Sequence, residues 1–287
     1  MVGAFDTPDY SYGVAVSEGY VYVTDYFSGL QIIDIVPSED TYIANRVDTP
    51  GASTAVVSSG DYAYVTDSWS LLIVDINPPE SASIVKTIDT PDMAWGVAVC
   101  DGYAYVAVDE EGLQIIDIDP PESAYIVQSV DTPGKAHGVA VSGGYAYVAD
   151  DTSGLQIIDV DPPESAYILN AVPTPDVACG VAVSGDFAYV ADGRSGLVIV
   201  DISQPLSARI FNVTDTPDMA RGVTILGRFA YVASGDSGLQ IIRIDHPGLE
   251  YIAASLDTPG DARSVAVSGN HAYVADHYSG LDIIELW

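Results

Sequence analysis

The strongest constraint in this sequence is a repeat of about 42 residues that runs along the whole chain. Each copy opens with the tripeptide Asp-Thr-Pro, except one that opens with Pro173-Thr174-Pro175. A fixed period of this size is typical of solenoids and propellers, in which one supersecondary unit is repeated. The copies begin at Asp6, Asp48, Asp89, Asp131, Pro173, Asp215 and Asp257.

Each copy contains four short runs that favour β-strands. In the fourth copy they span residues 138–142, 145–150, 155–160 and 167–172, and they are rich in Val, Ile and Tyr. The pair Gly143-Gly144 between the first two runs is a two-residue hairpin signal. No run has the length or period of a helix.

Four antiparallel strands repeated seven times predict an all-β fold, a seven-bladed β-propeller. A parallel β-helix is the alternative, but its coils usually need fewer residues. The last copy stops after its third strand, and residues 2–5 precede the first copy where a fourth strand belongs. We therefore expect one domain over residues 1–287, in which the N-terminal strand completes blade seven beside residues 281–286 and leaves no open sheet edge.

The third strand of each repeat carries a recognisable motif. Leu72-Ile73-Val74-Asp75 and Leu197-Val198-Ile199-Val200-Asp201, with Leu-Gln-Ile-Ile-Asp versions elsewhere, resemble the LVIVD-repeat family. That family is known mainly from bacterial and archaeal cell-surface or secreted proteins and is considered propeller-forming. The resemblance implies an extracellular or cell-surface protein, and it implies little about chemistry because few members have an assigned activity.

Composition excludes several partners. The chain has 41 acidic and 9 basic side chains and a formal net charge of −32, so it lacks the Lys and Arg that nucleic acid or an anionic membrane surface requires. No apolar run is long enough for membrane insertion. The sequence predicts no cofactor and no metal site, although acidic loops leave weak calcium binding open. We expect Cys100 and Cys179 to be free thiols, and the chain to be a monomer or part of a larger surface protein.

Residues that recur in every blade are most simply structural, so candidate functional residues are those that deviate. The position before the first strand, where the top face meets the central channel, varies most. Aromatic residues fill it in some blades and basic residues in others. Around the ring it reads Tyr12, Thr54, Trp95, His137, Cys179, Arg221 and Arg263.

The loops between the second and third strands add further aromatic and basic residues to the predicted top face. Aromatic planes bind sugars or flat apolar surfaces, and arginine binds carboxylate, sulfate or phosphate. The sequence therefore predicts a non-catalytic recognition or scaffold propeller that binds an anionic saccharide or a protein partner there. The predicted ligand-binding residues are Tyr12, Trp95, His137, Arg221, Arg263, Trp69, Tyr26, Arg194, His277 and Tyr278.

Two alternatives stay open. The first is a lyase or hydrolase acting on an anionic saccharide or lactone, with His137 or His277 as the base and Arg221, Arg263 and Tyr12 stabilising an anion. The second is a purely structural surface-layer module.

An aspartate also ends the second strand in five blades. We expect these carboxylates to close turns through Asx hydrogen bonds rather than to bind metal. They are Asp25, Asp67, Asp150, Asp192 and Asp276.

Overall fold

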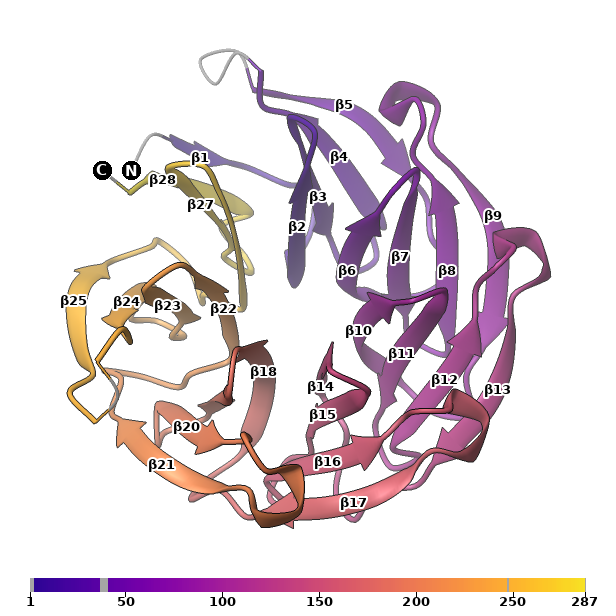
Figure 1. The fold of residues 1–287 in the computed structure, drawn as a ribbon. Coiled ribbons are helices and arrows are strands. Elements are labelled where there is room, and N and C mark those ends of the chain that lie inside the picture. The colour runs from indigo at the N-terminus through magenta and orange to yellow at the C-terminus, as the bar shows by residue number, and fades with distance from the viewer. Residues whose placement is uncertain (1–2, 37–40, 247, 287) are drawn as a thin grey trace.

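The computed structural model describes residues 3–36, 41–246 and 248–286. Within them the chain forms seven antiparallel sheets of four strands, arranged in a ring (Figure 1). Each sheet is one blade, and its strands follow one another from the channel outwards. The predicted all-β, seven-bladed propeller is confirmed.

The innermost and second strands of each blade form its first hairpin. The innermost strands are β2 (Gly13–Ser17), β6 (Ser53–Ser59), β10 (Ala94–Cys100), β14 (Gly138–Ser142), β18 (Ala178–Ser184), β22 (Gly222–Leu226) and β26 (Ser264–Ser268). The second strands are β3 (Tyr20–Thr24), β7 (Tyr62–Asp67), β11 (Tyr103–Val108), β15 (Tyr145–Ala149), β19 (Phe187–Asp192), β23 (Phe229–Ala233) and β27 (His271–Ala275).

The third strands carry the LVIVD-like motif, and the outer strands face solvent. The third strands are β4 (Leu30–Asp34), β8 (Ser70–Asp75), β12 (Leu113–Asp117), β16 (Leu155–Asp159), β20 (Leu197–Asp201), β24 (Leu239–Arg243) and β28 (Leu281–Glu285). The outer strands are β5 (Tyr42–Val47), β9 (Ser83–Asp89), β13 (Tyr125–Val130), β17 (Tyr167–Val172), β21 (Arg209–Thr214), β25 (Tyr251–Leu256) and, for blade seven, β1 (Gly3–Phe5). Within the described residues, short 3-10 helices precede four outer strands: η2 (Pro79–Ser81), η3 (Pro121–Ser123), η4 (Pro163–Ser165) and η5 (Pro205–Ser207).

The fourth blade shows how closely sequence pattern and structure agree. Strands β14 and β17 have the predicted bounds, whereas β15 and β16 each end one residue earlier than predicted. Gly143 and Gly144 both have positive φ, at 60° and 81°, as a tight hairpin turn with the twist of the flanking strands requires.

The N-terminal strand closes the ring. Gly3, Ala4 and Phe5 of β1 pair antiparallel with Ile283, Asp282 and Leu281 of β28, so blade seven contains both ends of the described chain (Figure 1). This confirms the predicted closure for residues 3–5. Val2 and Trp287 lie outside the described residues.

The core lies between neighbouring blades, and this explains why the strands are apolar on both faces. In β16, Ile158 packs toward blade three, where it joins a cluster with Tyr105. Leu155 and Ile157 of the same strand pack toward blade five against Val190. A strand covered on both faces reads as a continuous hydrophobic run rather than an alternating one.

The innermost strands approach one another closely around the channel. A Cβ at Gly138 would lie 2.9 Å from the carbonyl oxygen of Cys179 in the next blade, so a larger residue would displace backbone. The recurring glycine at this position is therefore structural.

Two further sequence-based expectations concern the cysteines and the membrane. Cys100 and Cys179 are free thiols, as predicted. Among the described residues, none of the helices has the length and apolar character to cross a membrane.

Candidate functional site

Two loops from each blade build the top face, and buried aspartates join them. Asp25, at the end of β3, accepts a hydrogen bond at 3.0 Å from the backbone N–H of Asp9 in the loop that enters the blade. Asp67 accepts one at 2.7 Å from the N–H of Gly51. The predicted Asx closure of the adjacent turn is wrong, because the carboxylate points to the entry loop. The structural role is the same in the other blades with this residue: Asp150, Asp192 and Asp276.

The position that follows the buried aspartate (replaced by Val108 in blade three and by Ser234 in blade six) has positive φ in all seven blades and hydrogen-bonds to the entry loop of the neighbouring blade. We call these the left-handed residues. Glycine adopts this backbone without steric cost, and other residues pay roughly 1–2 kcal/mol. Glycine occurs here in two blades, and Tyr and His occur in two others. The left-handed residues are Tyr26, Ser68, Asp109, Asp151, Gly193, Gly235 and His277.

The two aromatic left-handed residues belong to adjacent blades and anchor an aromatic cluster. The ring of Tyr10 stacks on His277, with centroids 4.5 Å apart and planes within 7°. Tyr12 stacks on Tyr26 at 5.3 Å and meets the edge of His277 at 5.3 Å. Phe27 contacts Tyr26 at 4.3 Å. Blades seven and one therefore share one continuous aromatic surface at the channel mouth.

Two arginines border this cluster, and one aspartate holds both. The Nε of Arg221 lies 3.0 Å from Asp261, and the Nη2 of Arg263 lies 2.7 Å from the same carboxylate. The guanidinium of Arg263 also lies 5.3 Å from the ring centroid of Tyr12, which is cation–π geometry. The arginines are thus partly neutralised within the protein. Sequence reasoning missed Asp261, although an acid two residues before Arg263 was a readable signal.

Burial shifts the pKa values of two groups in the aromatic cluster. Burial lowers the pKa of His277, and the positive charge of Arg263 lowers it further. Burial also raises the pKa of the Tyr12 hydroxyl. Both groups are neutral at pH 7, so the aromatic cluster presents uncharged rings.

Trp95 and His137 form a second, separate pair at the channel mouth. Their rings stack with centroids 5.5 Å apart and planes within 15°. Burial lowers the pKa of His137, and the buried indole N–H of Trp95 has no hydrogen-bond partner within the part of the chain that the structure describes. The small residues Thr54 and Cys179 separate this pair from Tyr12 and from Arg221 around the ring. Burial raises the pKa of the Cys179 thiol to about 11, which keeps it unreactive at pH 7.

The expected place of these residues just before the first strand holds in four blades. In the other three the strand starts earlier, and Thr54, Trp95 and Cys179 lie inside it at a register shift. The shift is a β-bulge, which inserts one residue without breaking the hairpin.

The residue after each left-handed residue lies on the outer rim of the top face. We call these the rim residues. Three consecutive blades carry exposed aromatic rings there, and the other four carry polar or charged side chains. The exposed fractions are 58% for Tyr278, 68% for Phe27 and 57% for Trp69. In chain order the rim residues are Phe27, Trp69, Glu110, Thr152, Arg194, Asp236 and Tyr278.

Grooves beside the rim also differ between an aromatic and a polar rim residue. Next to Trp69, a groove of about 230 Å³ is lined by Pro50, Gly51 and the carboxylates of Asp67 and Asp89, among others. The related groove in blade four, of about 360 Å³, holds polar residues and has Thr152 where Trp69 stands in blade two.

Two other basic residues of the top face, Lys135 and the predicted Arg194, do not join the arginine pair. Lys135 forms ion pairs with Asp109 at 3.1 Å and with Glu110 at 3.5 Å. Arg194 is exposed, and within the described residues its guanidinium forms no ion pair; only its backbone N–H is bound, by Asp176 at 2.7 Å.

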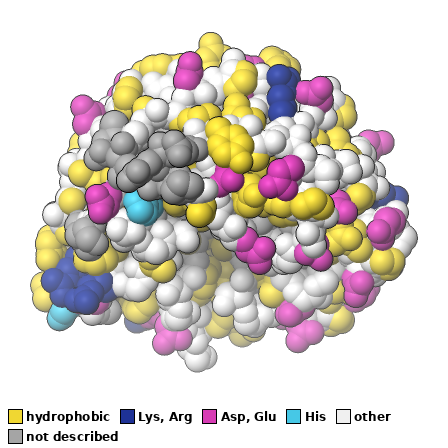
Figure 2. Space-filling model, turned by 90° about the horizontal axis from the view of Figure 1, so that it is seen from above, with side chains coloured by type: hydrophobic (Ala, Val, Ile, Leu, Met, Phe, Trp, Pro, Cys, Tyr) yellow, Lys and Arg dark blue, Asp and Glu magenta, His cyan; other side chains and the backbone are white. Residues whose placement is uncertain are grey.

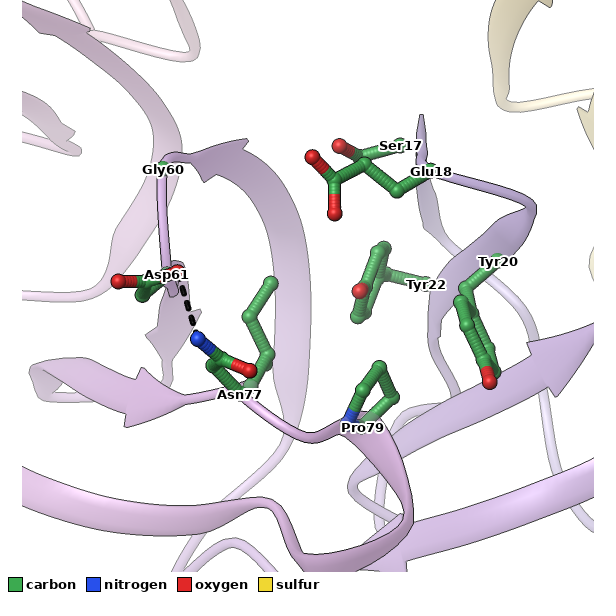
Figure 3. Close-up of a pocket in the computed structure, with 9 residues that line it drawn as sticks. Ser17, Glu18, Tyr20, Tyr22, Gly60, Asp61, Asn77 and Pro79 are labelled. Carbon is green, nitrogen blue, oxygen red and sulfur yellow. Dashed lines mark hydrogen bonds between the residues drawn. The ribbon is translucent and has the colours of Figure 1, made fainter.

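Grooves on the opposite face repeat from blade to blade. Between blades one and two, Glu18, Tyr20, Asp61 and Pro79 line one of about 110 Å³, and the amide of Asn77 donates to Asp61 at 3.0 Å (Figure 3). A related groove between blades three and four measures about 320 Å³. Because the feature recurs with the repeat, we ascribe it to the propeller architecture rather than to a specific ligand.

The structure therefore divides the ten predicted site residues. It brings together Tyr12, Tyr26, Arg221, Arg263, His277 and Tyr278; Trp95 and His137 form their own pair; Trp69 and Arg194 stand apart on the rim. Among the described residues, no three His, Cys, Asp or Glu side chains group closely enough to hold a metal ion.

This arrangement of blades and loops defines a seven-bladed propeller with an uneven top face. The LVIVD repeat matches seven segments, residues 9–45, 50–90, 91–132, 133–168, 176–213, 217–248 and 259–285. The chain belongs to the family of LVIVD-repeat proteins.

Solved structures agree on the fold. The WD40 β-propeller domain of Doa1 is similar to this chain with a TM-score of 0.81 at 11% identity, over 98% of this chain and 94% of that one. The WD40 repeats of RRP9 give 0.81 at 10% identity, over 98% and 96%. The propeller domain of Cps50 (Swd1) from Myceliophteria thermophila gives 0.77 at 12% identity, over 99% of both chains. No curated protein matches the sequence.

Proposed function

We propose that this protein is a non-catalytic recognition domain, and that its binding surface lies on the top face of blades seven, one and two. One observation carries the proposal: exposed aromatic rings occupy the rim of three consecutive blades and of no other blade. We call Tyr278, Phe27 and Trp69 the aromatic crescent. Exposed aromatic side chains that gather on one part of a surface mark interaction sites.

Backbone strain supports the same location. Tyr26 and His277 adopt a left-handed backbone, with φ of 44° and 51°, where Gly193 and Gly235 serve in blades five and six. Glycine adopts this backbone without steric cost, and a short polar residue such as Asp109 or Asp151 in blades three and four tolerates it, whereas a tyrosine ring gains nothing from it locally. Non-glycine residues in strained backbone gather at functional sites. Backbone strain at Tyr26 and His277 thus lowers the stability of the fold, and a role of the aromatic cluster in ligand binding would account for it.

The proposal includes an extracellular or cell-surface location. The association of LVIVD repeats with surface and secreted proteins supports it, as does the acidic composition, which favours solubility. Protease treatment of intact cells of the source organism tests it. Cleavage of the protein while cytosolic markers stay intact is the expected result, and complete protection would contradict it.

A binding screen with three classes of ligand tests the function. Anionic saccharides, neutral saccharides and basic peptides are titrated while tryptophan fluorescence and the melting temperature are followed. We expect one class to bind the wild type and to be lost in a Phe27→Ala/Trp69→Ala/Tyr278→Ala variant. A Thr152→Ala/Arg194→Ala/Asp236→Ala variant, altered at the same rim position in blades four to six, is the matched control.

Two other results would contradict the proposal. Turnover of any saccharide or lactone in the screen, abolished by His277→Ala, would favour the enzyme. Calcium-dependent self-association that is the same in the wild type and in both triple variants would favour the structural module.

A further inference from the structure

The charge around the aromatic crescent narrows the class of partner. We infer that the top face of blades seven, one and two binds a basic, arginine- or lysine-rich segment of another protein. This inference rests on the proposed function, because it assigns a partner to the surface proposed there. It differs from the anionic ligand that the sequence predicted.

Each aromatic rim residue has an exposed carboxylate beside it. Asp6 packs against the turn that carries Tyr278, since a Cβ at Gly280 would touch its backbone, and Asp48 packs likewise against the turn of Phe27. Asp89 pairs with Ser70, next to Trp69, and lines the same groove as its ring. All three carboxylates are exposed. Asp48 forms an ion pair with Arg46 at 3.0 Å, whereas Asp6 beside Tyr278 and Asp89 beside Trp69 form no ion pair within the described residues.

Apart from Arg46, the basic residues nearby do not offset these charges. Arg221 and Arg263 share Asp261, and Lys135 binds Asp109 and Glu110. Their guanidinium and ammonium groups already have anionic partners, so an incoming anion would have to compete with them. It would also approach a protein with a net charge of −32. Figure 2 shows one side of the molecule, where Asp and Glu are scattered widely and Lys and Arg are few.

Arginine side chains fit this surface in two ways. A guanidinium stacks on an aromatic face and pairs with a carboxylate at the same time. The protein already contains this arrangement, because Arg263 lies over Tyr12 and binds Asp261. Aromatic residues and arginine are also the side chains that contribute most to protein–protein binding. A basic segment would repeat the internal contact at the two ends of the crescent, beside Tyr278 and beside Trp69.

The negative electrostatic potential of the protein should also raise the association rate of a basic segment. Attraction between opposite charges accelerates association. This attraction weakens as salt rises, because ions screen charges from one another over about 8 Å at physiological ionic strength. Attraction of any polycation to an acidic protein would share this salt dependence. The test must therefore separate the crescent from the general charge.

Matched variants make that separation. Asp6→Asn/Asp89→Asn removes two carboxylates beside aromatic rim residues. Asp131→Asn/Asp215→Asn removes two exposed carboxylates from the same loop position beside polar rim residues. The net charge changes equally, so only the location differs. Phe27→Ala/Trp69→Ala removes rings at constant charge.

The probe is a fluorescent peptide of alternating arginine and leucine, and its anisotropy is measured with each protein near physiological salt. We expect the wild type to bind it, Asp6→Asn/Asp89→Asn and Phe27→Ala/Trp69→Ala each to lose affinity about tenfold or more, and Asp131→Asn/Asp215→Asn to bind within about twofold of wild type. A peptide with glutamine in place of arginine should not bind.

Equal losses of peptide affinity in both asparagine variants would overturn the inference, because non-specific attraction between the basic peptide and the acidic protein would then explain the binding. Binding of a neutral or anionic saccharide through Trp69 and Phe27, with no peptide binding, would overturn the inference and leave the proposed function standing. Binding of no probe through the crescent would overturn both.

Discussion

The two halves of the top face share one backbone and carry different surfaces. In blades five and six the left-handed residues are Gly193 and Gly235, and the rim residues are charged. In blades seven and one the left-handed residues are His277 and Tyr26, and the rim residues are aromatic. These turns hydrogen-bond to the next blade in both halves: the carbonyls of Gly193, Gly235, Tyr26 and His277 each accept from the neighbouring entry loop, and the two glycines also donate to it. The comparison teaches that the fold does not require the aromatic residues, and that they are retained at a cost in backbone strain.

The largest expected effect tests whether the scaffold is the same in both halves. Gly29 in blade one and Gly196 in blade five have φ of 71° and 77°, and a Cβ at either would lie 2.4 Å from a backbone carbonyl oxygen. We expect Gly29→Ala and Gly196→Ala each to lower the free energy of unfolding by about 2–4 kcal/mol. Chemical denaturation measures both. A clearly smaller loss in one of them would mean that the halves differ in backbone as well as in surface.

A second difference lies inside blade seven. Asp282 stands where Gln156 and Gln240 stand in blades four and six, and those glutamines donate to a turn carbonyl at 3.0 and 2.7 Å. Asp282 is fully buried, and neither carboxylate oxygen has a hydrogen-bond partner within the described residues. Burial, together with Asp276, raises its pKa to about 7.

This carboxyl makes stability depend on pH. Because the folded pKa lies above the unfolded value, the folded state binds the proton more tightly, and stability falls as pH rises from about 4 to about 7. We expect Asp282→Gln to raise the free energy of unfolding by about 2 kcal/mol at pH 8 and to change it little at pH 4. Urea denaturation at both pH values, with Gln156→Asp as the converse variant, measures this. A gain of the same size at pH 4 would show that ionisation is not the cause.

The sequence predicted the fold more completely than it predicted the site. The repeat was sufficient for blade number, strand order and ring closure, because each depends on recurring apolar residues and glycines. The mouth and rim residues were visible as deviations from the repeat. The shared carboxylate of Asp261 was not predicted, since it joins two blades through side-chain geometry. Nor was the left-handed backbone of Tyr26 and His277, because neither residue type signals positive φ.

Replacing the strained aromatic residues should separate stability from binding. Tyr26→Gly relieves backbone strain and loses stacking with Tyr12, so we expect the free energy of unfolding to change by less than about 1 kcal/mol. Binding through the aromatic crescent should fall, since Phe27 loses its neighbour. The reverse substitution, Gly235→Tyr, should cost about 2 kcal/mol or more, because it adds strain without a stacking partner and its Cβ would lie 2.7 Å from the Asp218 carboxylate. Thermal denaturation and peptide titration check both; a strongly destabilised Tyr26→Gly would make that residue structural.

The smallest effect concerns the arginine pair. Asp261→Asn removes the carboxylate between Arg221 and Arg263, whose side chains are about a quarter exposed. We expect the free energy of unfolding to fall by about 1 kcal/mol or less. Affinity for an anionic saccharide such as polygalacturonate should rise above that of the wild type, because two guanidinium groups become available. Unchanged affinity, measured by calorimetry, would show that Asp261 does not restrict anion binding.

Hydrogen–deuterium exchange with and without the arginine–leucine peptide tests the central claim most directly, because it reports on all seven blades at once. The account predicts slower exchange in the turns at residues 26–29, 68–70 and 277–280, and unchanged exchange in the equivalent turns at 151–154, 193–196 and 235–238. Protection spread evenly over the seven blades, or confined to the opposite face, would contradict it.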